Sequence, residues 1–248
     1  MKLLLVADSF PPMNSSSAIQ LDDLCKELFN QKHQVYVVFP SSHIDQKIEI
    51  SSNACYSILS ISIPDLRKSS MVKRAITELS LSFLLIFRFR QTPWTKIKFD
   101  GVIWYSPSIF FGLFAWYIKY KNNCKGYLIL RDIFPDWALD VGLLKKNFIY
   151  YFFKFFEIFQ YRVANVIGIQ TPGNEKYFQS NSGLHNKVEV LCNWLLPIPE
   201  SFPEIDIQLQ DSILSDKKIF VYAGNIGKAQ NVKSIIDIAE NLSESDDF

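Results

Sequence analysis

The sequence has few of the residues that mark fibrous, disordered or disulfide-linked proteins. Of 248 residues, only 9 are glycine and 11 are proline, which excludes a collagen-like chain or an extended flexible linker. The four cysteines, at positions 25, 55, 124 and 192, have neither the spacing of a zinc site nor the density of a disulfide framework, so we expect reduced thiols. The three histidines, His33, His43 and His185, also lack metal-ligand spacing, and no metal site is expected.

An excess of charge and a long uninterrupted apolar run are also missing. The 26 Lys+Arg residues nearly balance the 25 Asp+Glu residues, so no nucleic-acid partner is expected. Residues 1–7 are too short an apolar run for a signal peptide and are followed by Asp8. The longest stretch without charge, 101–118, contains Ser-Pro-Ser at 106–108 and fits a strand followed by a helix better than a membrane span. We therefore expect a cytoplasmic protein.

Short aliphatic runs alternate with amphipathic stretches of helix length. The runs lack the alternation of a half-buried strand, which is typical of parallel strands covered by helices on both faces. With 48% hydrophobic residues, the chain can bury a substantial core. We predict an α/β protein with a doubly wound, Rossmann-like parallel sheet. The runs lie at residues 2–7, 34–39, 101–105, 126–130, 165–169 and 187–191.

Three short sequences predict where helices begin. Ser17 and Gln20 have the spacing of a capping box, in which each side chain bonds a backbone N–H of the other residue. Proline at the first helical position is expected at Ser106-Pro107 and at Thr171-Pro172.

Prolines at 197, 199 and 203 predict an extended connector between two domains. We assign residues 1–195 to an N-terminal domain, 196–217 to the connector and 218–248 to the start of a second domain. A strand at 218–223 and a helix at about 231–242 are expected there. One strand and one helix cannot bury a core, so we expect that the second domain is cut short.

Three loops carry residues suited to an anionic ligand. The first strand is followed by Asn14, Ser15, Ser16 and Ser17 at the start of a helix, where unpaired N–H groups attract anions; the alternative is a simple helix cap. Arg131 and Asp132 end a later strand, where catalytic groups of open α/β sheets gather; the alternative is a structural ion pair. The third loop combines two glycines with a lysine before a helix and predicts phosphate binding. Its residues are Gly224, Asn225, Gly227, Lys228 and Gln230.

Residues 66–98 contain eight basic residues and one acidic residue. The basic residues surround the apolar run 79–87, a composition typical of a helix at an anionic lipid surface. The alternative is a core helix with solvated basic ends. The expected membrane contacts are Arg67, Lys68, Lys73, Arg74, Arg88 and Arg90.

Taken in order, a series of motifs over the whole chain resembles the GT-B glycosyltransferases of family 4. The details look most like the bacterial WbuB- and WcaI-like group, to which L-fucosaminyl transferase activity is ascribed. The motifs are Phe10-Pro11-Pro12, Arg131-Asp132-x-x-Pro135, Thr171-Pro172, Asn193-Trp194 and Gly224-Asn225-x-Gly227-x-x-Gln230.

The resemblance implies two Rossmann-like domains around a cleft, the first binding an acceptor and the second a nucleotide-diphosphate sugar, with no metal or other cofactor. Thr171, Asn193 and the loop of residues 14–17 would face the cleft. Ser15-Ser16 stands where the family has Gly-Gly, and Arg131-Asp132 replaces a common His-Asp, which makes Asp132 the expected catalytic residue beside Arg131. Asn225 and Gln230 replace the family's diphosphate-binding basic residues, and Lys228 would supply that charge.

The implied reaction is retaining transfer of a hexose or aminodeoxyhexose to a polyprenyl-diphosphate-linked glycan. It would serve surface polysaccharide synthesis (O-antigen, capsule or colanic-acid-like) at the inner face of the bacterial cytoplasmic membrane. The family's Glu-x7-Glu element is absent, so we expect this chain to be inactive alone. The alternative is a non-catalytic, membrane-associated partner with a degenerate donor site. An oxidoreductase or epimerase is disfavoured because no Gly-x-Gly-x-x-Gly follows the first strand.

Overall fold

The structure of the chain is a computed structural model, and it divides into two compact units, Met1–Leu196 and Pro197–Phe248. It describes residues 1–42, 44–63, 71–179, 182–197, 215, 219–224, 226 and 230–242, although the side chains of 71–76, 78, 79 and 182 are not described.

An eight-stranded sheet forms the centre of the first unit. Its order is β3-β4-β2-β1-β5-β6-β7-β8, and every neighbouring pair is parallel except β3 with β4. All six predicted strands are present, which confirms the doubly wound α/β fold. The strands are β1 Lys2–Val6, β2 Gln34–Ser41, β3 Ile48–Ser52, β4 Tyr56–Ser62, β5 Gly101–Ser106, β6 Lys125–Leu130, β7 Val166–Ile169 and β8 Val188–Val190.

The sequence does not predict β3 and β4. β3 has the sequence Ile-Glu-Ile-Ser-Ser and is mostly exposed at the edge of the sheet. β4 interrupts its aliphatic residues with serines, although Leu59 and Ile61 are fully buried. Neither strand has a continuous aliphatic run, so the signal that identifies the other strands is weak here. Their place is fixed by pairing, β4 with β2 in parallel and β3 with β4 in antiparallel register.

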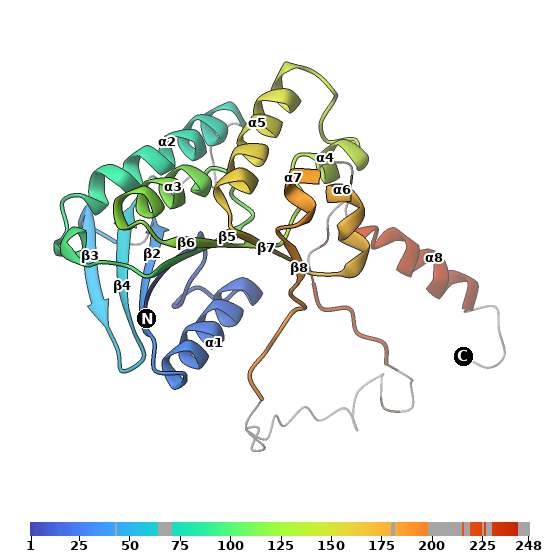
Figure 1. The fold of residues 1–248 in the computed structure, drawn as a ribbon. Helices are drawn as coiled ribbons and strands as arrows, with labels where there is room; N and C mark the ends of the chain where they lie inside the picture. The colour runs from blue at the N-terminus through green and yellow to red at the C-terminus, as the bar shows by residue number, and fades with distance from the viewer. Residues whose placement is uncertain are drawn as a thin grey trace. The chain divides into compact units, whose positions relative to one another are not determined.

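Helices cover both faces of the sheet. Figure 1 shows α2, α3 and α5 on one face and α1 on the other. Most of the core lies beneath α2, α3 and α5, and a smaller cluster lies beneath α1. The helices of the first unit are α1 Ser16–Asn30, α2 Met71–Phe89, η1 Pro93–Lys96, α3 Phe111–Asn122, α4 Asp136–Asp140, α5 Phe148–Val163, η2 Pro172–Glu175, α6 Lys176–Gln179 and α7 Ser182–His185.

Two of the three predicted helix starts are wrong. The cap of α1 is Ser15, whose hydroxyl accepts a bond of 3.1 Å from Ala18 N, and Gln20 points its side chain elsewhere. α3 begins at Phe111, because Pro107 lies in a turn that carries the chain from β5 to the helix. The third start is confirmed: Thr171 is the N-cap of η2, and Pro172 takes its first position.

α3 and α5 approach closely at Gly112. A Cβ atom at this position would lie 2.6 Å from Gln160 Cβ and 2.9 Å from Gln160 Cα. Glycine is therefore required for this contact. A side chain here would clash with the backbone of α5, which cannot move aside as the end of a flexible side chain can. The contact holds α5 beside the strand ends that carry the candidate site.

In the second unit the predicted helix is present as α8, Lys233–Leu242. The strand predicted at 218–223 is wrong within the described residues 219–223, which adopt no regular structure. A strand needs a neighbour for its backbone hydrogen bonds, and the described part of this unit contains no second strand. The side chains of Phe220 and Val221 are about four-fifths exposed.

Candidate functional site

The carboxyl ends of the parallel strands meet at one edge of the sheet. The strand order runs outward from β1 in one direction and from β5 in the other, so the topological switch point lies between these two strands. Open α/β sheets bind ligands beside such a point. The loops after β1, β5, β6, β7 and β8 provide the candidate site.

Arg131, directly after β6, is bonded to side chains from α1 and from the loops after β7 and β8. Its Nη1 donates to Gln20 Oε1 of α1 at 2.7 Å and to Asn193 Oδ1, after β8, at 2.5 Å. A guanidinium has only donors, so the Gln170 amide is oriented with its oxygen toward Arg131 and accepts from Nε, because both N–H groups of Nη1 are used by Gln20 and Asn193. We call these four residues the Arg131 cluster. It fixes the guanidinium at the edge of the sheet.

The partners of Arg131 are neutral, so they hold the guanidinium without cancelling its charge. Among the described residues no carboxylate lies within ion-pair distance of it. The guanidinium carbon lies 5.8 Å from the centre of the Tyr105 ring. Burial raises the pKa of Tyr105 to about 12, Arg131 opposes this shift, and Asp8 and Asp132 add to it. The charges of Arg131, Asp8 and Asp132 therefore all act on the Tyr105 hydroxyl at the strand ends.

Asp132 is exposed beside this cluster. Partial desolvation raises the pKa of its carboxyl group, and the neighbouring Arg131 opposes the shift. A carboxylate with a raised pKa is a better proton acceptor than a fully hydrated one. The ion pair considered for Arg131 and Asp132 does not form, because the guanidinium is turned toward the amides of its cluster.

The loop after β1 is ordered by its serines. Ser15 Oγ lies 2.5 Å from Ser9 Oγ and 3.0 Å from Ser17 Oγ, and it also accepts the bond from Ala18 N. Asn14 and Ser16 are exposed. Ser15 is therefore a structural cap, which leaves Asn14 and Ser16 as the residues of this loop best placed to meet a ligand.

Replacing Ser15 with alanine should lower the free energy of unfolding by about 1 kcal/mol, because α1 loses its side-chain cap. Urea unfolding followed by far-UV circular dichroism measures the change. Ser16→Ala is the matched control, since Ser16 is exposed in the first turn. Equal stabilities of the two variants would show that Ser15 does not act as the cap.

Sequence reasoning missed two serines at the switch point. Ser106, the last residue of β5, is fully buried, and neither its hydroxyl nor that of Ser108 has a hydrogen-bond partner among the described residues. The Ser-Pro-Ser sequence was the available signal, but it predicts a helix start rather than hydroxyl groups at a strand end.

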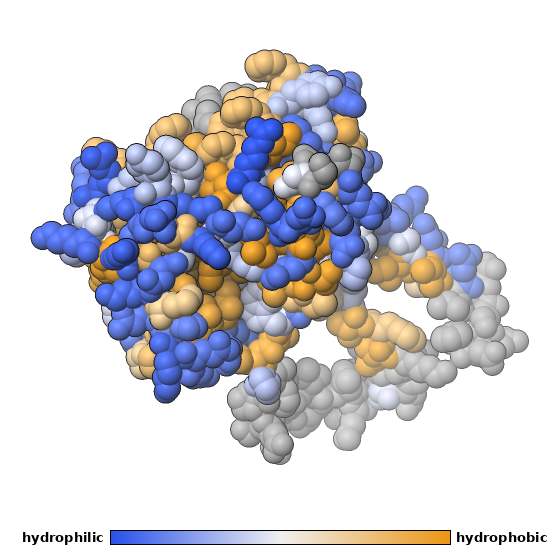
Figure 2. All heavy atoms as spheres, viewed as in Figure 1, coloured by the Kyte–Doolittle hydropathy of each residue, from blue (hydrophilic) through white to orange (hydrophobic). Residues whose placement is uncertain are grey.

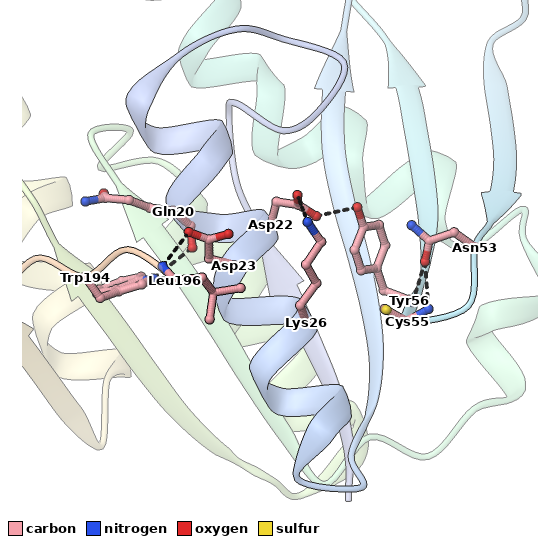
Figure 3. A network of polar contacts seen from close by, with 9 residues as sticks. All are labelled: Gln20, Asp22, Asp23, Lys26, Asn53, Cys55, Tyr56, Trp194 and Leu196. Carbon is pink, nitrogen blue, oxygen red and sulfur yellow. Dashed lines mark hydrogen bonds and ion pairs between the residues drawn. The ribbon is translucent and has the colours of Figure 1, made fainter. Parts of the chain in front are cut away.

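The segment after β8 is tied to α1 on the other side of the cluster. Trp194 Nε1 donates to Gln20 O at 2.8 Å, and Leu196 N donates to Asp23 Oδ2 at 3.0 Å, as Figure 3 shows. Asn193 directly precedes Trp194, so these bonds hold the segment in the position from which the Asn193 side chain reaches Arg131. Thr171 is exposed at the end of β7, beyond Gln170.

A second polar cluster lies on the inner side of α5. Lys154 Nζ lies 2.8 Å from Asp136 Oδ2 and 2.5 Å from Glu157 Oε2. Tyr150 donates to Asp136 at 2.7 Å, and Tyr161 donates to Glu157 at 3.0 Å. These five residues, the Lys154 cluster, line a cavity of about 420 Å³. Burial raises the pKa of Glu157 to about 7, and Lys154 opposes the shift.

The remaining predicted site residues belong to the second unit or to residues 67–90. In the second unit, Gly224 and Gln230 are exposed, whereas Asn225, Gly227 and Lys228 lie outside the described residues. Of the predicted membrane contacts, Arg67 and Lys68 lie outside them, as do the side chains of Lys73 and Arg74. Arg90 is exposed, and Arg88 donates to Gln91 at 3.3 Å. These assignments stay predictions.

The apolar run of α2 is largely a core element. Leu81, Leu85 and Phe89 are buried, whereas Phe83 and Phe87 are 60% and 57% exposed. No helix in the described part of the chain is both long and apolar enough to cross a bilayer. The described residues also contain no group of three or more His, Cys, Asp or Glu side chains placed to hold a metal ion.

Comparison with known proteins gave matches among solved structures. No family model and no curated protein matches the sequence. The catalytic domain of starch synthase IV from Arabidopsis thaliana, bound to ADP and acarbose, matches with a TM-score of 0.52 and 10% identity over 78% of this chain and 51% of that chain. UGT89C1 of the same plant, complexed with UDP-L-rhamnose, matches with a TM-score of 0.51 and 15% identity over 79% and 50%.

A third structure, an α,α-trehalose-phosphate synthase from Burkholderia xenovorans with glucose-6-phosphate, has a TM-score of 0.51 and 11% identity, over 73% of this chain and 43% of that chain. The chain thus spans about half the length of the solved structures it matches. At these identities the likeness establishes the fold alone. The first unit has the Rossmann-like fold found in GT-B glycosyltransferases.

Proposed function

We propose that this chain supplies the acceptor-binding part of a retaining glycosyltransferase. The reaction moves a sugar, such as an aminodeoxyhexose, from a nucleotide-diphosphate donor to a polyprenyl-linked glycan used for surface polysaccharide. One observation carries the proposal: in a sheet of this fold, a fixed and uncancelled guanidinium lies beside a carboxylate with a raised pKa at the strand ends.

The two groups take different roles in this proposal. Arg131 attracts a phosphate group, because its amide partners orient the guanidinium while leaving its charge available. Asp132 accepts the proton of the acceptor hydroxyl as that oxygen attacks the anomeric carbon from the face that the nucleotide diphosphate leaves, so the configuration is retained and the diphosphate departs with the electrons of the glycosidic bond. No metal or other cofactor takes part in the proposed steps. Asn14, Ser16, Thr171 and Asn193 complete the acceptor side.

The donor side belongs to residues 218–248 in this proposal, after a connector at 196–217. Gly224, Asn225, Gly227, Lys228 and Gln230 would meet the diphosphate. Backbone N–H groups and one lysine suit that role, because the leaving nucleotide gains negative charge as the glycosidic bond breaks.

A chimera tests the proposed reaction. Residues 1–196 form a compact unit, so they are joined to the nucleotide-binding half of a solved glycosyltransferase and supplied with its nucleotide sugar. The acceptor is a short-chain polyprenyl-diphosphate N-acetylglucosamine. We expect transfer to the acceptor with retention of the donor's anomeric configuration. Acceptor binding without transfer by any chimera would favour the alternative, a non-catalytic partner that only holds the acceptor.

A further inference from the structure

Helix α5 packs polar side chains together with Phe153 and Phe156 against the rest of the unit, and it leaves aromatic side chains exposed on its outer side. Tyr150, Glu157 and Tyr161 are buried, and they are satisfied by bonds within the Lys154 cluster. On the opposite side, Phe148 is 83% exposed and Phe155 is 64% exposed. An ordinary surface helix has a polar outer side, whereas the outer side of α5 is aromatic.

The exposed aromatic side continues into the turn before the helix. In the view of Figure 2, orange and pale-orange side chains lie beside blue ones over α5. Contiguous exposed apolar residues of this kind mark interaction surfaces rather than ordinary solvated surface. We call this surface the α5 patch, and it consists of Val141, Leu143, Phe148, Ile149, Tyr151 and Phe155.

Charge at the patch is mainly positive. Lys145 and Lys146 are exposed between Leu143 and Phe148, and residues 141–156 contain no Asp or Glu. Lys154, the third lysine of this stretch, is held inside by Asp136 and Glu157. The patch therefore presents aromatic and aliphatic side chains beside two lysines, and one exposed carboxylate, Asp140, borders it at Val141.

We propose that the α5 patch docks onto an anionic phospholipid surface. Phe148 and Phe155 are seven residues apart, about 10 Å along the helix, so α5 would lie in the plane of the membrane interface. Aromatic rings and leucine enter the boundary between headgroups and acyl chains, while lysines contact the lipid phosphates. Helix α4 (Asp136–Asp140) begins four residues after Asp132 and ends directly before Val141 of the patch. Docking of the patch would therefore bring the candidate site near the membrane.

The charge pattern distinguishes this occupant from others. A second copy of the chain would place four lysines in one contact against only the two Asp140 side chains that border the patches, which is unfavourable. An anionic lipid surface instead complements the lysines. This docking surface adds to the proposed function, whose acceptor is lipid-linked, but it does not depend on the transfer reaction.

Vesicle co-sedimentation of the 248-residue chain tests the docking surface. The probes are vesicles of phosphatidylcholine alone and of phosphatidylcholine with about 40% phosphatidylglycerol, a content chosen to give a strong surface potential. We expect binding to the anionic vesicles only, and release as ionic strength rises. Phe148→Ser with Phe155→Ser should lower the partition coefficient at least 30-fold. Lys145→Gln with Lys146→Gln should lower it about 25-fold at low ionic strength.

Phe83→Ser with Phe87→Ser on α2 tests the competing membrane contact predicted from the sequence, because these rings are similarly exposed and are followed by Arg88 and Arg90. This variant should bind vesicles like the unchanged chain, and circular dichroism confirms that each variant is folded. Loss of binding in the α2 variant alone, or no binding to anionic vesicles by the unchanged chain, would overturn the proposal. A concentration-dependent dimer abolished by the Phe148 and Phe155 changes would identify a second copy as the occupant and also overturn it. Vesicle binding without sugar transfer by the chimera would refute the reaction and leave the docking surface in place.

Discussion

Replacing Asp132 with asparagine in the chimera should lower the turnover number by about 100-fold or more, because asparagine cannot accept the proton of the acceptor hydroxyl. The KM for the nucleotide sugar should change little, since Asp132 belongs to the acceptor side of the proposed site. Turnover of the unchanged chimera should also fall as the pH decreases through the raised pKa of Asp132, because the protonated acid is no base. The asparagine variant should lack this acidic limb.

Asp140→Asn is the control for that experiment, since Asp140 is an exposed carboxylate at the end of α4. Its turnover should stay within about twofold of the unchanged chimera, as expected for surface positions away from the reaction. If both variants lost turnover equally, Asp132 would have no special place in the reaction.

The largest effect on stability is expected at Lys154. Replacing it with methionine removes the cation between Asp136 and Glu157, which leaves two carboxylates facing each other at a largely buried site. Loss of one partner of a buried ion pair costs about 3–5 kcal/mol. Urea unfolding at pH 8 measures this loss, and Lys146→Met, at an exposed lysine, should change stability by less than about 0.5 kcal/mol.

The same variant should be less destabilised at pH 5. Burial raises the pKa of Glu157 in the folded chain to about 7, above its ordinary value, so the folded state binds this proton more tightly than the unfolded state does. The stabilisation from proton binding is present at low pH and is lost as the pH rises through about 7. Without the opposing lysine, this dependence should become steeper. Adding Glu157→Gln should reduce the dependence and recover part of the stability at pH 8, and a flat pH profile for Lys154→Met would contradict the account.

The sequence predicted those parts of the fold that depend on burial of continuous aliphatic runs. β1, β2, β5, β6, β7 and β8 were all identified in this way, and the chain direction then put Arg131 and Asp132 at the carboxyl edge. β3 and β4 were not predicted, because serines interrupt their aliphatic residues. β4 is placed by its pairing with β2, and β3 by its pairing with β4. A strand at 218–223 was predicted from local composition, which supplies no partner for the backbone.

The partners of the site residues could not be predicted, because they come from distant parts of the chain. Gln20 and Arg131 are 111 residues apart in sequence, yet their side chains form a bond of 2.7 Å. The orientation of α5 was hidden for a related reason. Tyr150, Lys154, Glu157 and Tyr161 recur at helical spacing and would normally indicate a solvated face, but they face inward because they satisfy one another.

The most direct test of the account is acceptor binding at Arg131. Isothermal titration calorimetry of the 248-residue chain with geranyl-diphosphate N-acetylglucosamine, a soluble analogue of the lipid-linked acceptor, should give saturable binding at one site. Arg131→Met should weaken it at least tenfold, as expected when a charge-assisted bond to phosphate is lost. Arg162→Met, at an exposed arginine on α5, should leave it unchanged. Equal affinity of the Arg131 variant and the unchanged chain, or no binding by the unchanged chain, would contradict the assignment of the acceptor site to the Arg131 cluster.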